Sequence, residues 1–174
     1  MSTASIEFST LTLRDALDLA ILVDEEAEER YEELADQLEL HHTPEAASFF
    51  HRMSSEERRH VAELRQRRQQ LFPEAGLGIP HARAWDVKTP EYDGIHAFMT
   101  VREAMQTALG AEEKAEAFFE AALHEVHDEG VAAFFAELRA EETRLHEQVE
   151  RDLAALPPEP AARPEDFEDE PTEQ

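Results

Sequence analysis

The sequence predicts an all-α protein, a four-helix bundle in which two helical hairpins are joined by a long crossover. Glycine is scarce, with 5 among 174 residues, whereas alanine, leucine, glutamate and arginine, which favour helices, are abundant. Apolar residues recur at helical spacing along four long stretches. The two halves of the chain also repeat, since TLRDALDLA at 12–20 matches TVREAMQTA at 100–108. Two related helical hairpins with a long connection between them form a four-helix bundle.

The four helices are expected at about 10–40, 44–71, 95–126 and 130–156. Thr43 and Pro44 are typical of the N-cap and the first helical residue of the second helix. Residues 72–94 gather proline, glycine and other turn-forming residues, which indicates a crossover rather than a tight hairpin. A shorter break at 127–130 separates the last two helices. We therefore predict one helical domain over 1–156.

Composition excludes several classes of protein. A net charge of −25 is far too negative for a nucleic-acid binder, because phosphate backbones need Lys and Arg on the contact face. The absence of cysteine excludes disulfides, iron–sulfur clusters and an attached rubredoxin-type centre. No apolar run approaches the ~18 residues of a membrane span. The start, MSTASIEFST, does not resemble a signal peptide. We expect a cytoplasmic protein with a disordered, acidic and proline-rich tail at 157–174.

Each helix is expected to place one acidic residue on its buried face. With ~100° per residue, Asp24 lies at the centre of the apolar stripe of the first helix, whereas the neighbouring Glu25 points away from it. The corresponding acids on the apolar stripes of the other three helices are Glu57, Glu112 and Glu142. A lone buried carboxylate is costly unless it is paired, neutralised or bound to a cation.

Four such acids in one bundle would repel one another unless a positive charge lay between them. The basic residues are mostly arginines on outer faces, and neither of the two lysines, Lys88 and Lys114, lies on a core stripe. A cluster of divalent metal ions is therefore the simplest compensating charge. The alternative is that one or two of the acids lie at the edge of a stripe and reach water.

The motifs around these acids resemble those of a known family. They are Leu-Ala-Ile-x-x-Asp24-x-x-Ala-x-x-x-Tyr31, Glu57-x-x-His60, Ala111-Glu112-x-x-Ala-x-x-x-Phe119 and Phe-Phe…Glu141-Glu142. Over about 10–156 the chain resembles a rubrerythrin-type member of the ferritin-like superfamily. The resemblance implies two iron ions, with the ligands Asp24, Glu57, His60, Glu112 and Glu142 and a second histidine on the fourth helix. It further implies that Glu57 and Glu142 bridge the metals and that each histidine completes one coordination sphere.

The sequence departs from the family pattern at two positions. The usual ligand of the first helix is glutamate, and Asp24 is shorter by one methylene. In the fourth helix, Leu145 stands where a second Glu-x-x-His motif would place its histidine. His146 lies ~40° around the helix from Glu142, against ~60° for Leu145. The i,i+4 spacing therefore still allows Glu142 and His146 to reach one metal. His146 is therefore predicted as a ligand, in a metal site that differs from its counterpart.

Other candidate residues have simpler interpretations. Tyr31 and Phe119 lie two turns from Asp24 and Glu112 and are interpreted as core packing. Trp85 is interpreted as an anchor that holds the crossover against the bundle. The remaining histidines are expected in loops, on the surface or beside the ligands.

The predicted function is that of a non-haem di-iron carboxylate protein, with manganese as the alternative metal. The resemblance implies reaction with O2 or H2O2, as ferroxidase or peroxidase. Without a rubredoxin-like module, peroxide turnover would need a separate electron donor. Two other functions remain open: iron sequestration in an assembly of subunits, and a metal-free bundle that acts as an interaction or adaptor protein. A homodimer or larger homo-oligomer is expected, with no nucleic-acid or membrane partner.

Overall fold

The computed structural model describes residues 6–41, 43–74, 76, 87–90 and 98–158. It confirms the predicted all-α fold. The helices are α1 (Leu13–Leu40), α2 (Pro44–Leu71), α3 (Val101–Glu125) and α4 (Glu129–Ala155), and a 3-10 turn, η1 (Phe8–Thr10), precedes them. The described residues form no strand. None of their helices is long and apolar enough to cross a membrane.

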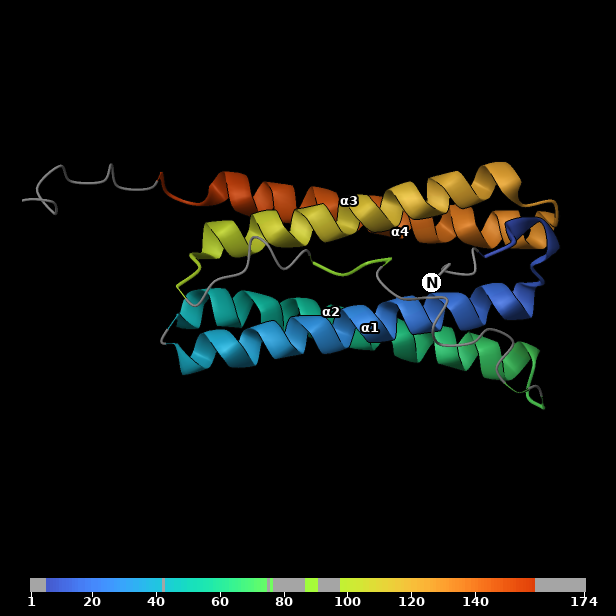
Figure 1. Cartoon of the computed structure of the whole chain (residues 1–174), viewed down its shortest axis with the longest axis horizontal. Helices are drawn as coiled ribbons and strands as arrows, with labels where there is room; N and C mark the ends of the chain where they lie inside the picture. Colours follow the sequence, from blue (N-terminus) through green and yellow to red (C-terminus); the bar gives the residue numbers. More distant parts are fainter. Residues whose placement is uncertain (1–5, 42, 75, 77–86, 91–97, 159–174) are drawn as a thin grey trace, which may run out of the picture.

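The helices form two hairpins that lie side by side (Figure 1). α1 packs along α2 and α3 packs along α4, while the contacts between the two hairpins are fewer. The described part of the crossover, 87–90, runs between the hairpins (Figure 1). All four of its residues are buried. This part of the connection therefore belongs to the interior of the bundle and not to its surface.

Capping boxes explain where α1 and α3 begin. The hydroxyl of Thr12 accepts a hydrogen bond from the backbone N–H of Asp15, and the Asp15 carboxylate accepts one from the N–H of Thr12. Thr100 and Glu103 repeat this arrangement. Such bonds satisfy amide donors that the first turn of a helix leaves free. Both helices therefore begin later than the predicted positions 10 and 95, although 95–97 lie outside the described residues.

The apolar core consists of two clusters. One gathers Leu17 and Leu19 with the ring of Phe119 and the Phe134–Phe135 pair. The other gathers Tyr31, Phe50, Met53, Met105 and Val149. Along every helix, the acidic residue singled out from the sequence lies between members of the two clusters. The core thus consists of two apolar blocks with a layer of carboxylates between them.

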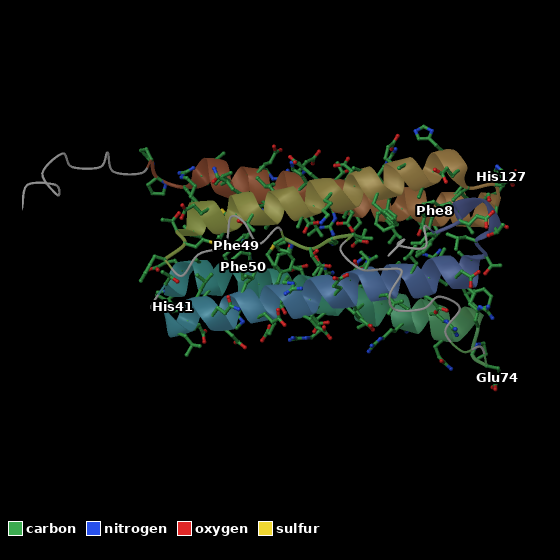
Figure 2. The ribbon with its side chains drawn as sticks, viewed as in Figure 1. Phe8, His41, Phe49, Phe50, Glu74 and His127 are labelled. Carbon is green, nitrogen blue, oxygen red and sulfur yellow. The ribbon has the colours of Figure 1, made fainter. Side chains whose placement is uncertain are left out.

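Aromatic side chains pack in both halves of the bundle, with Phe8 toward one end and Phe49 and Phe50 in the other half (Figure 2). At one end, the Phe8 ring of η1 packs edge-on against Phe118 and Phe135, with ring centroids 5.5 and 6.3 Å apart. Toward the other end, Phe50 stacks on Tyr31 at 5.8 Å and meets Phe49 edge-on at 5.5 Å. Each buried aromatic ring removes a large apolar area from water. The two ends therefore stabilise the helix pairing that places the carboxylates at the centre.

Two predictions fall outside the described residues. Trp85, interpreted as an anchor of the crossover, is one of them, and nearly all of the acidic tail, from 159 to 174, is the other.

Candidate metal centre

One carboxylate from each helix reaches the centre of the bundle. The exposed fractions of Asp24, Glu57, Glu112 and Glu142 are 2%, 1%, 0% and 1%. The position of each acid on the buried stripe of its helix brings all four together. None of them lies at the edge of its stripe, in contact with water.

A lysine ammonium lies among these four carboxylates. Lys88 is 0% exposed. Its Nζ lies 2.8 Å from Glu142 Oε2, 2.9 Å from Glu57 Oε1, 3.5 Å from Glu112 Oε2 and 3.9 Å from Asp24 Oδ1. It also donates a hydrogen bond to Glu57 Oε2 at 3.1 Å. Lys88 therefore contacts both hairpins at once.

The position of Lys88 corrects the sequence interpretation, which left the four acids without a buried basic partner. Lys88 lies on no helical stripe, because it belongs to the crossover. Its flanking residues Val87 and Thr89 are 8% and 4% exposed, so the segment itself enters the core. Two features of the sequence agree with this position: the chain has only two lysines, and four core acids require a cation.

The ammonium does not satisfy all the oxygens around it. A lysine has three N–H donors, whereas four carboxylates offer eight oxygens. Among the described residues, the buried side-chain oxygens that accept no hydrogen bond of good geometry are Asp24 Oδ2, Glu57 Oε1, Glu112 Oε2 and Glu142 Oε2. Each lies only within ion-pair distance of Lys88 or His60. Buried oxygens of this kind are ligands that a divalent cation prefers, so the residues fit a carboxylate-bound metal.

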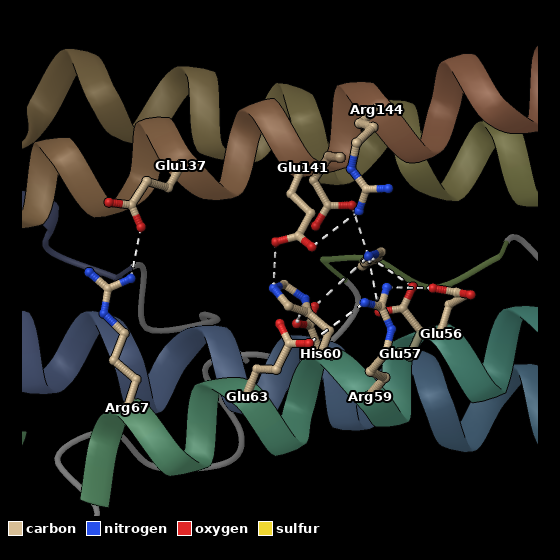
Figure 3. A network of polar contacts seen from close by, with 12 residues as sticks. Glu56, Glu57, Arg59, His60, Glu63, Arg67, Glu137, Glu141 and Arg144 are labelled. Atoms are coloured by element: carbon tan, nitrogen blue, oxygen red, sulfur yellow. Dashed lines mark hydrogen bonds and ion pairs between the residues drawn. The ribbon is translucent and has the colours of Figure 1, made fainter. Parts of the chain in front are cut away.

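His60 extends the cluster toward α4. Its Nδ1 lies 2.7 Å from Asp24 Oδ2 and its Nε2 lies 2.7 Å from Glu141 Oε2. Figure 3 shows His60 on α2 and Glu141 on α4 facing each other. One ligand atom each from Asp24, Glu57 and His60 lie within 4.8 Å of one another. These three buried residues of the first hairpin form a group that could hold one metal ion.

The pKa values of the acids follow from their burial. Burial raises the pKa of Glu57 to about 8, Lys88 opposes the rise, and repulsion from Asp24 and Glu142 adds to it. Burial likewise raises the pKa of Glu112 well above its ordinary value, again against the effect of Lys88. Burial lowers the pKa of Lys88, but the four carboxylates raise it more, so that the net shift is upward. The ammonium and the protons retained on Glu57 and Glu112 therefore offset part of the negative charge of the cluster.

His60 also carries a positive charge. Burial lowers the pKa of its imidazole, but the bonds to Asp24 and Glu141 outweigh this effect and raise the pKa to about 10. The bond to His60 in turn lowers the pKa of Glu141. At neutral pH His60 is an imidazolium, and it must lose a proton before a ring nitrogen binds a metal.

Tyr31 contacts the acid cluster directly, in addition to the packing role that the sequence suggested. Its hydroxyl donates a hydrogen bond of 3.2 Å to Glu112 Oε1, and the residue is 0% exposed. Burial raises the pKa of the phenol well above its ordinary value, and the negative charge of Glu112 adds to the rise. Tyr31 therefore remains a neutral donor that holds Glu112 in place.

The fourth helix supplies no imidazole to the centre among the described residues. The Nε2 of His146 lies 3.4 Å from Glu150 Oε1 and 3.9 Å from Glu113 Oε1, both of which are exposed. Leu145 lines a groove of about 400 Å³ between α2 and α4. In this structure His146 thus lies with surface carboxylates, and its role as a metal ligand stays a prediction.

Exposed ion pairs border His60 on the side of α2 and α4 (Figure 3). The guanidinium of Arg59 lies 2.7 Å from Glu56 and 3.6 Å from Glu63, and Arg144 lies 3.4 Å from Glu141. Exposed pairs of this kind contribute little stability. Their effect here is local, because Arg144 and His60 hold Glu141 from opposite sides.

A second buried ion pair lies in α1 and α2 and was missed from the sequence. Asp18 is 1% exposed, and its Oδ1 accepts a hydrogen bond of 2.8 Å from Arg68 Nε. Arg68 also donates to the backbone carbonyls of Phe72 and Gly76. Asp18 lies on the face of α1 that packs on α2. The sequence signal for this ion pair was the presence of Arg68 on the facing helix. This pair is structural and separate from the acid cluster.

Comparison with known proteins identifies the family of this chain. The sequence model of the family described as Rubrerythrin matches residues 15–154. The chain belongs to the rubrerythrin family. A solved structure of an uncharacterized conserved protein from Magnetospirillum magnetotacticum MS-1 is similar, with 27% sequence identity and a TM-score of 0.67. The match covers 87% of this chain and 100% of that chain. No curated protein matches the chain.

Membership of the rubrerythrin family supports a di-iron carboxylate protein, and the carboxylate and imidazole groups described above are candidate ligands. The family and the fold together confirm the ferritin-like architecture expected from the sequence.

Proposed function

We propose that this member of the rubrerythrin family binds Fe(II) at the central carboxylates and acts as a ferroxidase or peroxidase. The predicted ligands are Asp24, Glu57, His60, Glu112, Glu142 and His146. Bound iron would supply the electrons that reduce O2 or H2O2. Manganese, which accepts the same ligand types, is the alternative metal. Turnover with peroxide would draw on a separate electron donor, and a homodimer is the proposed assembly.

The observation that carries this proposal is the set of buried carboxylate oxygens that accept no hydrogen bond among the described residues. Four acids at one depth of the core oppose stability unless cations compensate them. Lys88 provides one positive charge, and protons on His60 and Glu57 provide partial relief. A divalent cation would replace the protons and bind directly to oxygens that accept no hydrogen bond.

The residues of the site have distinct roles in this proposal. The carboxylate of Glu57 approaches Asp24 on one side and Lys88 on the other. It would therefore contact a metal ion held among the central carboxylates. His60 would give up its proton and bind through a ring nitrogen, while Glu141 holds the opposite nitrogen. Tyr31 orients Glu112. The two apolar clusters exclude water from both sides of the carboxylate layer.

Anaerobic titration with Fe(II) tests the proposal. The wild type is expected to bind iron and to develop ferric absorbance in the near ultraviolet when O2 or H2O2 is admitted. Glu57→Gln keeps the side-chain shape but removes a charged ligand, and it should weaken iron binding at least ~10-fold, which corresponds to about 1.4 kcal/mol.

Glu63→Gln is the matched control for Glu57→Gln. It lies on the same helix, its side chain is 60% exposed, and it should leave iron binding unchanged. A Glu57→Gln variant that binds iron as the wild type does would contradict the proposal. Iron that binds but never reacts with either oxidant would contradict the redox part alone.

Lys88 favours a second candidate function, a metal-free bundle that serves as an interaction protein. An internal ammonium with four carboxylates around it provides some charge compensation without any metal. Thermal unfolding separates the two functions, because a ligand that binds only the folded state raises its stability. A melting temperature that is the same with chelator, Fe(II) and Mn(II) would favour the metal-free function.

A further inference from the structure

We propose that Lys88 holds the place of one of the two metal ions, so that the wild type binds one divalent cation tightly and a second only by displacing the ammonium. This inference rests on the proposed metal-binding function and deepens it. It assigns the tight site to Asp24, Glu57 and His60. In the other part of the cluster, Glu112 and Glu142 pair with the Lys88 ammonium instead of a metal ion.

The distances place the ammonium closer to one part of the cluster. Lys88 Nζ lies 2.8 Å from Glu142 and 3.5 Å from Glu112, the two acids of the second hairpin, but 3.9 Å from Asp24. Glu57 of the tight site also pairs with the ammonium, at 2.9 Å, so the difference between the two parts rests on Asp24 and Glu142. A cation between Glu112 and Glu142 would meet Lys88 at a distance where like charges repel strongly in a buried site.

The imidazole groups show the same asymmetry. His60 lies with Asp24 and Glu57, and their ligand atoms are within 4.8 Å of one another. On the second hairpin, His146 pairs with the exposed Glu113 and Glu150. With no imidazole beside it among the described residues, the second part of the cluster offers two carboxylates that already share an ammonium. The first part therefore offers Fe(II) one more ligand, the imidazole of His60, than the second part does.

The surroundings of Lys88 oppose its withdrawal. Val87 is 8% exposed and belongs to the same apolar cluster as Leu19 and Phe135, and Thr89 is 4% exposed. Moving the backbone of Lys88 away from the cluster would also remove these neighbours from the core, since they are covalently attached. Apolar burial is worth ~25 cal/mol per Å². A second metal must therefore overcome both the ion pairs of Lys88 and the packing of its segment.

Equilibrium dialysis against Mn(II), followed by metal analysis, tests the inference. Mn(II) suits the same ligands and does not require an oxidant. The wild type should bind one Mn(II) per chain tightly, with any second binding at least ~10-fold weaker, a difference of about 1.4 kcal/mol. Lys88→Met removes the charge and keeps an unbranched side chain, and it should bind two Mn(II) with similar affinity.

Electron paramagnetic resonance gives a second readout that does not depend on activity. The wild type should show the spectrum of an isolated Mn(II), and Lys88→Met the spectrum of two magnetically coupled ions. Lys114→Met, which changes the only other lysine of the sequence, is the matched control and should behave as the wild type.

The outcomes separate this inference from the proposed function. Two equally tight Mn(II) ions in the wild type would overturn the inference and leave the proposed function standing. A folded Lys88→Met that binds only one would also overturn it. A wild type that binds neither Mn(II) nor Fe(II) would overturn the inference and the proposed function together.

A pair of variants tests the inference if Lys88→Met does not fold. Asp24→Asn should abolish the tight Mn(II) site, because Asp24 belongs to the group that holds the metal. Glu112→Gln should retain that site, because Glu112 faces the ammonium at 3.5 Å. Equal losses in the two variants would overturn the inference.

Discussion

Lys88 Nζ lies 2.8 Å from Glu142 Oε2, which joins the crossover to α4 at the centre of the bundle. The same ammonium lies 2.9 Å from Glu57 Oε1 on α2, so one side chain links the two hairpins through two buried ion pairs. Contacts between the hairpins are fewer than those within them. The carboxylate layer is thus also a place where the two halves of the bundle are held together.

Lys88→Met should destabilise the metal-free protein. Removing one partner of a buried ion pair typically costs about 3–5 kcal/mol, because the remaining charges stay buried. Urea unfolding in the presence of a chelator measures the free energy of unfolding. Lys114→Met is the control and should change it by less than about 1 kcal/mol. Equal stability of the two variants would show that the carboxylates do not need the ammonium.

The stability of the metal-free protein should fall as the pH rises. Between pH 4.5 and about 8, the folded state keeps a proton on Glu57 that the unfolded chain has lost. Between pH 6.5 and about 10, it likewise keeps the proton of His60. Because the folded state binds more protons in these windows, the free energy of unfolding decreases with pH, by about 1.4 kcal/mol per pH unit for each full proton.

Unfolding midpoints at about pH 6 and about pH 9, with chelator present, check this prediction. Glu57→Gln removes one of the two titrations and should make the dependence shallower. A wild type whose stability rises over this range would contradict the upward pKa shifts. Mn(II) should bind more tightly at the higher pH, because protons compete with the metal for His60 and Glu57.

Tyr31→Phe should cost about 1–2 kcal/mol of stability, because Glu112 Oε1 loses its phenol donor while staying buried. The change removes only the hydroxyl, so the stacking on Phe50 at 5.8 Å is retained. Urea unfolding measures the cost. Titration of the phenol absorbance checks the pKa of Tyr31. In the wild type, the absorbance change that Tyr31→Phe lacks should occur only above the ordinary pKa range of tyrosine, because the phenol is buried. Ionisation of that signal at an ordinary pKa would contradict the buried contact.

The helical residues of the site follow from periodicity, whereas Lys88 does not. A period of 3.6 residues fixes which side chains share a face, so Asp24 and Glu112 could be placed on the core stripes of their helices without a structure. A crossover has no such period, and its path depends on tertiary packing that no local pattern encodes. The start of α3 was predicted too early, although the sequence contained the signal for it. The Thr100-x-x-Glu103 motif is a recognised capping signature and marks the start at Val101.

Arg68→Met should destabilise the protein by about 3–5 kcal/mol, because it leaves the carboxylate of Asp18 buried without its guanidinium partner. The Asp18→Leu, Arg68→Met double variant should recover part of that loss, since the uncompensated charge is gone. Recovery should be incomplete, because Arg68 also donates to the carbonyls of Phe72 and Gly76. Arg65→Met on the same helix, at an exposed pair with Glu25, is the control and should stay within about 1 kcal/mol of the wild type. If the double variant were less stable than Arg68→Met alone, the buried charge of Asp18 would not be the cause of the loss, and the carbonyl contacts would account for it instead.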